Sequence, residues 1–577
     1  MKARWYGRGL LWLVAVVLVA CSKPAPPQEQ VTPPIVETEV PVPEQLLAEG
    51  VIPTPNASWT KLQRNIGGLV GILPMTFGGL LFTLSGFDVL AGDVVDGSQP
   101  AYFAISSASL GAPAASGQRR EPAPHYVFAL RMIESRKARA MLLDGDRAMF
   151  TAEERGGMTR LRGKGARESD ATMAMTKSGF LLVASSAADL DELGAYAYRN
   201  LPKKPLPSEA LVVSMPRSVV RGMLRAKLGA AWAPYRDDLA QQDKQARAAH
   251  GGRAPDFGDP QAILGAIDGL VQKKLALLEK LESVRVALDP TDAELRLTAT
   301  LEVAQGDTTF SQMVTGDASP LLSAPSDALV SVLYRDSEQE RSADADAFAP
   351  WLASVVGQRL SEADTSRLRA LHQAWAKGRG DALTVSFFGG GAQTPGVSAC
   401  AKVQKPEAMK ELFTGFPDLL RLKAIREPLK LKSVDVRPFD REGIKGSEIE
   451  LYAPSAKGEA SSAKAVKGGT PAISVAYSDA APGERACLAL TSDPVHLLAN
   501  TAKPAHRLGD DAQTANMLGS LGERSRLVAA VHALSDAEGN PLPALVFAWG
   551  KSDQSGFARV QVTYTWVREL MRRSLKF

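Results

Sequence analysis

The chain has 577 residues, which is too long for a single hydrophobic core and predicts two or more domains. Apolar residues make up 45% and charged residues 23%, a globular composition that excludes a chain disordered throughout and a multi-span membrane protein. The formal net charge is +4, and Lys2, Arg4 and Arg8 contribute three of these charges in a segment that we expect to be removed. The remaining charge is too small to indicate binding to nucleic acid.

The N-terminal segment has the form of an export signal. Its basic start is followed by the apolar run LLWLVAVVLVA, which is too short to span a bilayer and ends directly before Cys21. The end of the run, Leu18-Val19-Ala20-Cys21, resembles the lipobox of bacterial lipoproteins. The resemblance implies that residues 1–20 are a signal peptide. It also implies that Cys21 becomes the first residue and carries diacylglycerol and palmitate chains, which anchor the protein in a membrane.

A proline-rich tether follows the lipidation site. Seven prolines lie between residues 22 and 44, so we expect residues 21–44 to form an extended, lipidated tether. Ser22 follows the cysteine where an aspartate would retain the protein at the inner membrane, and by resemblance to known sorting rules this favours the outer membrane. We therefore expect a lipid-anchored protein of the cell envelope, with its folded part in the periplasm or at the cell surface.

The stretch Ile66–Phe87 contains 22 residues without a charge, so a membrane-inserting hairpin has to be considered. Its six glycines and Pro74 instead favour two short buried helices. We expect the first to run from about Trp59 to Leu73 with Ser58 as its N-cap, and the second to begin at Pro74.

The order of predicted elements repeats along the chain. The repeat predicts an α+β fold of two tandem lobes, residues 45–317 and 318–577, each an antiparallel sheet with helices packed on one face. The matched segments are 101–106 with 382–389, 125–132 with 396–403, 149–163 with 431–452, 172–197 with 473–500, 209–216 with 525–533, and 284–303 with 544–565. Ser186 and Ser492 occupy matching positions as predicted N-caps.

The two predicted lobes differ in what they insert. The first lobe gains a helical insert over 217–281, whose charge-rich amphipathic helices would cover a sheet or dock a partner. The second gains a Lys- and Ser-rich segment, 454–471, which has too little apolar content to pack and which we expect to be a disordered loop.

Motifs that carry chemistry are missing from the sequence. Six histidines and three cysteines show no metal-ligand spacing, and neither a phosphate-binding loop nor a GxSxG elbow is present. The sequence therefore predicts no catalytic residue, no metal site and no cofactor.

Two cysteines remain once Cys21 is lipidated. Cys400 and Cys487 lie in predicted strands of the second lobe, each between small alanines. In an exported protein they could form a disulfide between neighbouring strands, and they could equally remain two buried thiols.

The body of the chain resembles only uncharacterised two-half envelope lipoproteins of bacteria, which implies no activity. We expect a non-enzymatic binding or scaffold component of the cell envelope. Its partners would be the membrane, through the lipid anchor, and an unknown envelope protein or apolar ligand. A carrier of a lipid or other apolar ligand between the two lobes is the alternative, suggested by the uncharged Ile66–Phe87 stretch. An envelope enzyme without a recognisable motif is the third reading.

Overall fold

The computed structural model describes residues 38–110, 125–144, 149–163, 171–249, 260–356, 360–390, 393–427, 431–452, 473–478, 484–532 and 541–575. Cys21, the predicted signal peptide, the predicted tether as far as residue 37 and the predicted loop 454–471 lie outside these ranges.

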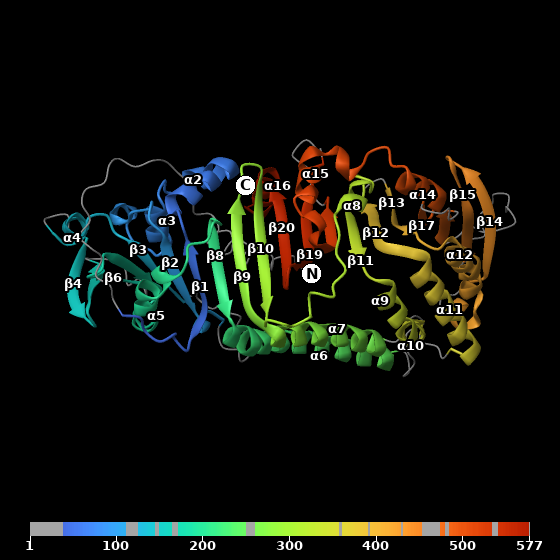
Figure 1. The fold of residues 1–577 in the computed structure, drawn as a ribbon, viewed down its shortest axis with the longest axis horizontal. Helices are drawn as coiled ribbons and strands as arrows, with labels where there is room; N and C mark the ends of the chain where they lie inside the picture. Colours follow the sequence, from blue (N-terminus) through green and yellow to red (C-terminus); the bar gives the residue numbers. More distant parts are fainter. Residues whose placement is uncertain are drawn as a thin grey trace. The chain divides into compact units, whose positions relative to one another are not determined.

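The protein is an α+β protein, as predicted, and its strands pair antiparallel (Figure 1). All twenty strands are assigned to one sheet, which replaces the expected pair of separate sheets. The reason lies in strand β10 (Glu294–Val303), which pairs with β20 (Ser555–Thr563). An unpaired edge strand exposes a row of backbone N–H and C=O groups, and this pairing satisfies them.

The described residues form two compact units. The first unit contains the residues up to Gly222, Leu281–Glu302 and those from Val560 onward. The second unit contains Met223–Lys280 and Val303–Arg559. Each unit is described by itself below.

The strands of the first unit pair in the order β4, β5, β6, β7, β3, β2, β1, β8, β9, β10. The remaining bounds are β1 (Leu46–Ile52), β2 (Ala101–Ser106), β3 (Tyr126–Arg131), β4 (Phe150–Arg155), β5 (Met158–Gly163), β6 (Thr172–Thr176), β7 (Phe180–Ala184), β8 (Leu211–Pro216) and β9 (Leu281–Pro290). Its helices are α2 (Pro55–Ile66), α3 (Phe77–Leu84), α4 (Ser135–Leu143), α5 (Ala187–Arg199) and α16 (Tyr564–Leu575).

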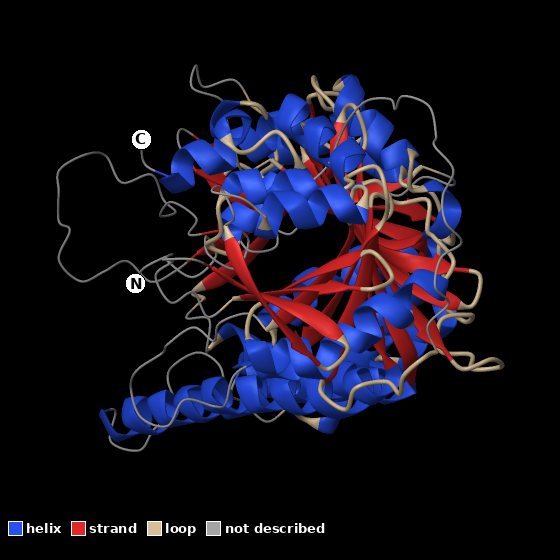
Figure 2. Cartoon of the chain, turned by 90° about the vertical axis from the view of Figure 1, so that its left-hand side faces the viewer, coloured by secondary structure: helices blue, strands red, loops and turns tan. Residues whose placement is uncertain are grey.

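Helices cover both faces of this sheet, which corrects the expectation of helices on one face (Figure 2). Along β2, Ala101 and Phe103 join the core under α2 and α3, whereas Tyr102 and Ala104 join the core under α5. Successive side chains of a strand point to opposite faces, so a strand that is apolar throughout needs cover on both sides.

The uncharged stretch Ile66–Phe87 belongs to the core of the first unit. Ile66, Phe77 and Phe82 are each at most 2% exposed. The predicted boundaries need correction, because α2 ends at Ile66 before Gly67, whose φ of 63° breaks the helix, and α3 begins at Phe77. Among the described residues, the structure contains no helix that combines the length and the apolar character needed to cross a membrane.

The strands of the second unit pair in the order β14, β15, β16, β17, β13, β12, β11, β18, β19, β20. Their bounds are β11 (Val330–Arg335), β12 (Arg379–Gly390), β13 (Gln393–Val403), β14 (Ser433–Arg441), β15 (Ile444–Tyr452), β16 (Ile473–Ser478), β17 (Arg485–Thr491), β18 (Ser525–Val531) and β19 (Leu545–Ser552).

Ten helices accompany these strands in the described part of the second unit. They are α6 (Arg225–Ala249), α7 (Pro260–Lys280), α8 (Ser319–Leu322), α9 (Glu338–Ala343), α10 (Ala345–Val356), α11 (Glu362–Gly378), α12 (Pro406–Arg421), α13 (Lys423–Arg426), α14 (Pro494–Ala502) and α15 (Ala512–Gly519). Helices α6 and α7 lie within the predicted insert 217–281.

Candidate functional site

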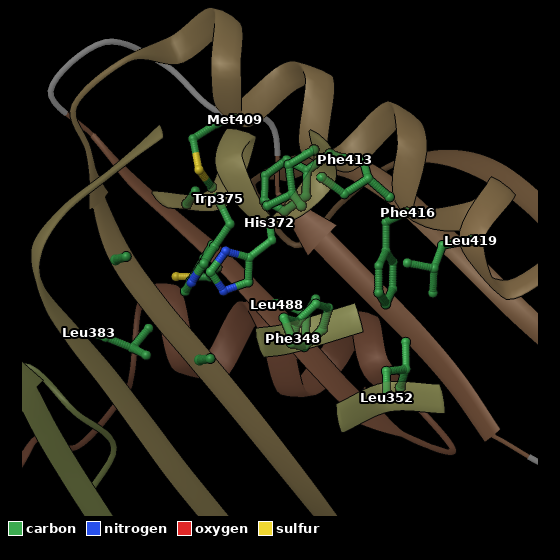
Figure 3. A pocket seen from close by; sticks show the side chains of 16 residues that line it. Phe348, Leu352, His372, Trp375, Leu383, Met409, Phe413, Phe416, Leu419 and Leu488 are labelled. Atoms are coloured by element: carbon green, nitrogen blue, oxygen red, sulfur yellow. The ribbon is translucent and has the colours of Figure 1, made fainter. Parts of the chain in front are cut away.

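A cavity of about 510 Å³ lies inside the second unit, between helices α10, α11 and α12 and strands β12, β13 and β17 (Figure 3). Of its sixteen lining residues, all but His372 are aliphatic, aromatic or sulfur-containing. They are Phe348, Leu352, Leu371, His372, Trp375, Leu383, Ala399, Ala401, Met409, Leu412, Phe413, Phe416, Leu419, Ala486, Cys487 and Leu488. The volume is within the range of about 300–1,000 Å³ that is usual for small-molecule sites.

Small residues on the sheet leave the space open. Ala399 and Ala401 alternate along β13, and Ala486 of β17 lies directly opposite Ala401. Residues two apart on a strand share a face, so these alanines form a common floor. Because an alanine side chain ends at Cβ, the floor stays low, and Leu488, opposite Ala399, rises at its side.

Helix α12 forms the roof with an apolar stripe. Met409, Leu412, Phe413, Phe416 and Leu419 recur at helical spacing and all line the cavity. Pro406 stands at the first helical position, where its missing N–H costs no hydrogen bond. This pattern places one continuous apolar face of the helix over the alanine floor.

Aromatic contacts and a glycine hold the roof in position. The Phe413 ring stacks on Tyr477 of β16 with 4.6 Å between centroids. Gly415 lets α12 approach α11 closely, since a Cβ at this position would lie 2.4 Å from Cδ2 of Leu371.

His372 of α11 brings an ionisable group into this apolar lining. Its ring packs against Phe348 of α10, with centroids 5.0 Å apart, and it lies beside Trp375 (Figure 3). Its Nδ1 atom is buried and has no hydrogen-bond partner among the described residues. Burial lowers the pKa of His372, so its imidazole is neutral at pH 7.

A buried ionic cluster adjoins the cavity at the end of α11. Arg379 is 2% exposed, and its guanidinium carbon lies 4.9 Å from the centre of the Trp375 ring. Arg379 donates to Asp336 over 2.6 Å, and Arg341 donates to the other oxygen of Asp336 over 2.8 Å. Burial lowers the pKa of Arg379, while Asp336 opposes this shift. The cluster fixes the junction between α11 and β12.

The two remaining cysteines form a disulfide. Cys400 of β13 and Cys487 of β17 are cross-strand partners with a Cα–Cα distance of 4.2 Å. Both sulfur-bearing residues belong to the core beneath α14, together with Val495 and Leu498. The bond ties together the two strands that supply the alanine floor.

A grouping of serine, histidine and aspartate in the first unit has a structural explanation. Asp189 accepts hydrogen bonds from the hydroxyls of Ser185 and Ser186, at 2.7 and 2.5 Å, and lies 3.0 Å from Nδ1 of His125. A serine nucleophile needs a histidine base, whereas here both serines donate to the carboxylate. Ser186 also accepts from the Asp189 backbone N–H and thereby caps α5, as predicted.

The sequence did not identify the cavity. It predicted Cys21, which lies outside the described residues, together with Cys400 and Cys487, which the structure joins beside the floor. The apolar spacing of α12 was the available signal, but that spacing is the same for a helix that packs without a gap. No group of three or more metal-binding side chains is present in the described ranges.

Comparisons with known proteins give little. No protein-family model matches the sequence, and no curated protein matches it significantly. Among solved structures, the chain is similar to TP0453, a Treponema lipoprotein. Its crystal form I shows 12% identity over 44% of this chain and 85% of that chain, with a TM-score of 0.20. Crystal form IV shows 10% identity over 46% and 99%, with a TM-score of 0.19. Likeness at this level carries no argument about function.

Proposed function

We propose that the protein is a non-enzymatic lipoprotein of the cell envelope that binds an apolar ligand in the cavity of its second unit. The observation that carries the proposal is the cavity itself, about 510 Å³ with fifteen of its sixteen lining residues apolar. Water has almost no hydrogen-bond partners in such a space, so an apolar molecule is the favoured occupant. Its transfer from water would be driven by the apolar area that it buries.

This proposal relocates the apolar ligand. The sequence suggested a site between two lobes, because Ile66–Phe87 carries no charge. That stretch supplies core residues of the first unit, whereas the cavity is lined by α10, α11 and α12 of the second. The alternative reading therefore becomes a specific binding function, and the general scaffold role gains no comparable observation.

The proposed anchor gives the binding function a place. A chain acylated at Cys21 would stay at a membrane surface, where acyl chains and other apolar molecules are available. The proline-rich residues before the described part would let the binding unit work at a distance from that surface.

We further propose that the chain arose by internal duplication. Each of the nine strand pairings within β1 to β10 has a counterpart in which both strand numbers are ten higher. For example, β3 pairs with β7 and β13 pairs with β17. Nine repeated pairings support a common origin more strongly than the order of elements alone.

A dye-binding experiment tests the binding function. N-phenyl-1-naphthylamine is an uncharged apolar dye whose fluorescence rises in apolar sites, and we expect it to bind the purified protein. Ala486→Phe adds a ring to the cavity floor and should weaken binding at least about 10-fold, equivalent to about 1.4 kcal/mol.

The matched control lies on the same strand face. Leu490→Phe alters an exposed residue of β17, 37% exposed, and should leave dye binding unchanged. Circular dichroism verifies that both variants fold. Equal dye binding by the Ala486→Phe variant and the wild type would show that this cavity is not the site.

A further inference from the structure

The polar atoms of the cavity bear on what kind of apolar ligand it takes. A pure hydrocarbon would leave the buried Nδ1 of His372 without a partner, as it is among the described residues. An unsatisfied buried polar atom costs roughly 1–3 kcal/mol, so a ligand that supplies the missing hydrogen bond binds with an advantage.

We propose that the cavity selects a single-chain amphiphile whose one oxygen-bearing end, a carboxyl or a hydroxyl group, hydrogen-bonds Nδ1 of His372. The inference rests on the proposed binding function and deepens it. His372 lies in the same lining as Trp375, while the aliphatic and aromatic side chains of α12 cover the rest of the space (Figure 3). The geometry thus offers one polar end and an otherwise apolar enclosure.

The chemistry of the lining favours a single small head group. No carboxylate and no lysine or arginine lines the cavity, so neither a zwitterionic nor a multiply charged head group would find partners. A neutral imidazole can donate to an oxygen or accept from an O–H group, and both candidate ends provide an oxygen. Fatty acids and long-chain alcohols share this chemistry.

The charges near His372 are balanced in sign. Asp344, which is exposed at the start of α10, raises the pKa of His372 and Arg379 lowers it, although burial has the larger effect. No strong field therefore distinguishes the acid from the alcohol, and the experiment has to compare the two.

Displacement of the bound dye by ligands of equal chain length tests the proposal. Palmitic acid, 1-hexadecanol and hexadecane share sixteen carbons and differ at one end. We expect the acid or the alcohol to displace N-phenyl-1-naphthylamine at about 3- to 10-fold lower concentration than hexadecane, the range that one hydrogen bond provides. The stronger of the two identifies the head group.

Variants locate the preference. His372→Phe keeps a ring and removes the nitrogen, so dye binding should persist while the preference over hexadecane disappears. His496→Phe alters an exposed histidine of α14 and should keep the preference. If His372→Phe unfolds, the ¹⁵N resonance of the His372 imidazole in the wild type provides a second readout. It should shift with palmitic acid or hexadecanol and not with hexadecane.

The outcomes separate the two proposals. Failure of the wild type to bind the dye would overturn the binding function itself. Dye binding with equal displacement by all three ligands, or an unchanged preference in folded His372→Phe, would overturn the head-group assignment alone.

Discussion

Two histidines of the second unit lose contact with water when the chain folds. Burial lowers the pKa of His372, against the opposing effect of Asp344. Burial also lowers the pKa of His532, whose Nδ1 lies 3.3 Å from the carbonyl oxygen of Leu542, while its Nε2 has no partner among the described residues. An unfolded histidine titrates near about 6.5, so the unfolded chain binds protons at pH values where the folded chain does not.

The free energy of unfolding should therefore fall as the pH drops below about 6.5, and it should keep falling until the folded-state pKa values are passed. Urea titrations between about pH 7.5 and pH 5 measure this dependence. In His532→Gln one of the two contributions is absent, so its stability should depend less steeply on pH. Equal slopes for the variant and the wild type would contradict the assignment.

Single residues also show how far sequence reasoning reaches. Ser186 caps α5 as predicted, because the helix begins one residue later at Ala187. Ser492 does not cap α14, since Asp493 takes that position and accepts from the backbone N–H of His496. Ser58 lies inside α2, where its hydroxyl donates to the carbonyl of Ala210. Neighbouring residues with similar capping chemistry cannot be distinguished from the sequence alone.

At the scale of elements, strands β13 and β17 combine two roles. One face presents Ala399, Ala401 and Ala486 to the cavity, and Cys400 and Cys487 belong to the core on the other side, under α14. The disulfide spans 87 residues of sequence, and loop closure of that length restricts the unfolded chain strongly.

Replacing both cysteines should lower the stability of the second unit by roughly 2–5 kcal/mol. The double variant Cys400→Ala, Cys487→Ala can be compared with the wild type by urea denaturation, with and without reductant. Reductant should destabilise the wild type and leave the double variant unchanged. A wild type whose midpoint is insensitive to reductant would count against a stabilising bond.

The elements also explain why the cavity escaped prediction. Spacing along α12 identifies its apolar face, and alternation along β13 identifies the alanines. Neither pattern states which helix covers which strand. A gap arises only when small floor residues meet large roof residues from a segment distant in sequence, and that pairing is a tertiary property.

For the whole molecule, the α+β class and the repeated order of elements could be predicted because local patterns set both. The single sheet could not be, since it depends on β10 pairing with β20, two strands about 260 residues apart in sequence. Likewise, helices on both faces of the sheet follow from strands such as β7 that are buried throughout, a pattern without the alternation that marks a one-sided sheet.

The proposed anchor is a property of the complete chain. Lipidation should depend on the thiol of Cys21, so cells grown with labelled palmitate should incorporate label into the wild type and not into Cys21→Ala. The variant should accumulate as an unlipidated precursor or soluble form. Cys400→Ala, which retains Cys21, serves as the control and should be labelled normally. Equal labelling of the Cys21→Ala protein would show the anchor assignment to be wrong.

The central claim is that an apolar ligand occupies the cavity beneath α12. A crystal of the protein grown with a fatty acid that carries bromine at the end of its chain tests this claim most directly, because anomalous scattering locates the bromine without reference to any fitted ligand. We predict an anomalous peak among Phe413, Phe416 and Leu488, with continuous density leading toward His372. A peak at another position, or a cavity without density when the ligand is bound in solution, would contradict the account.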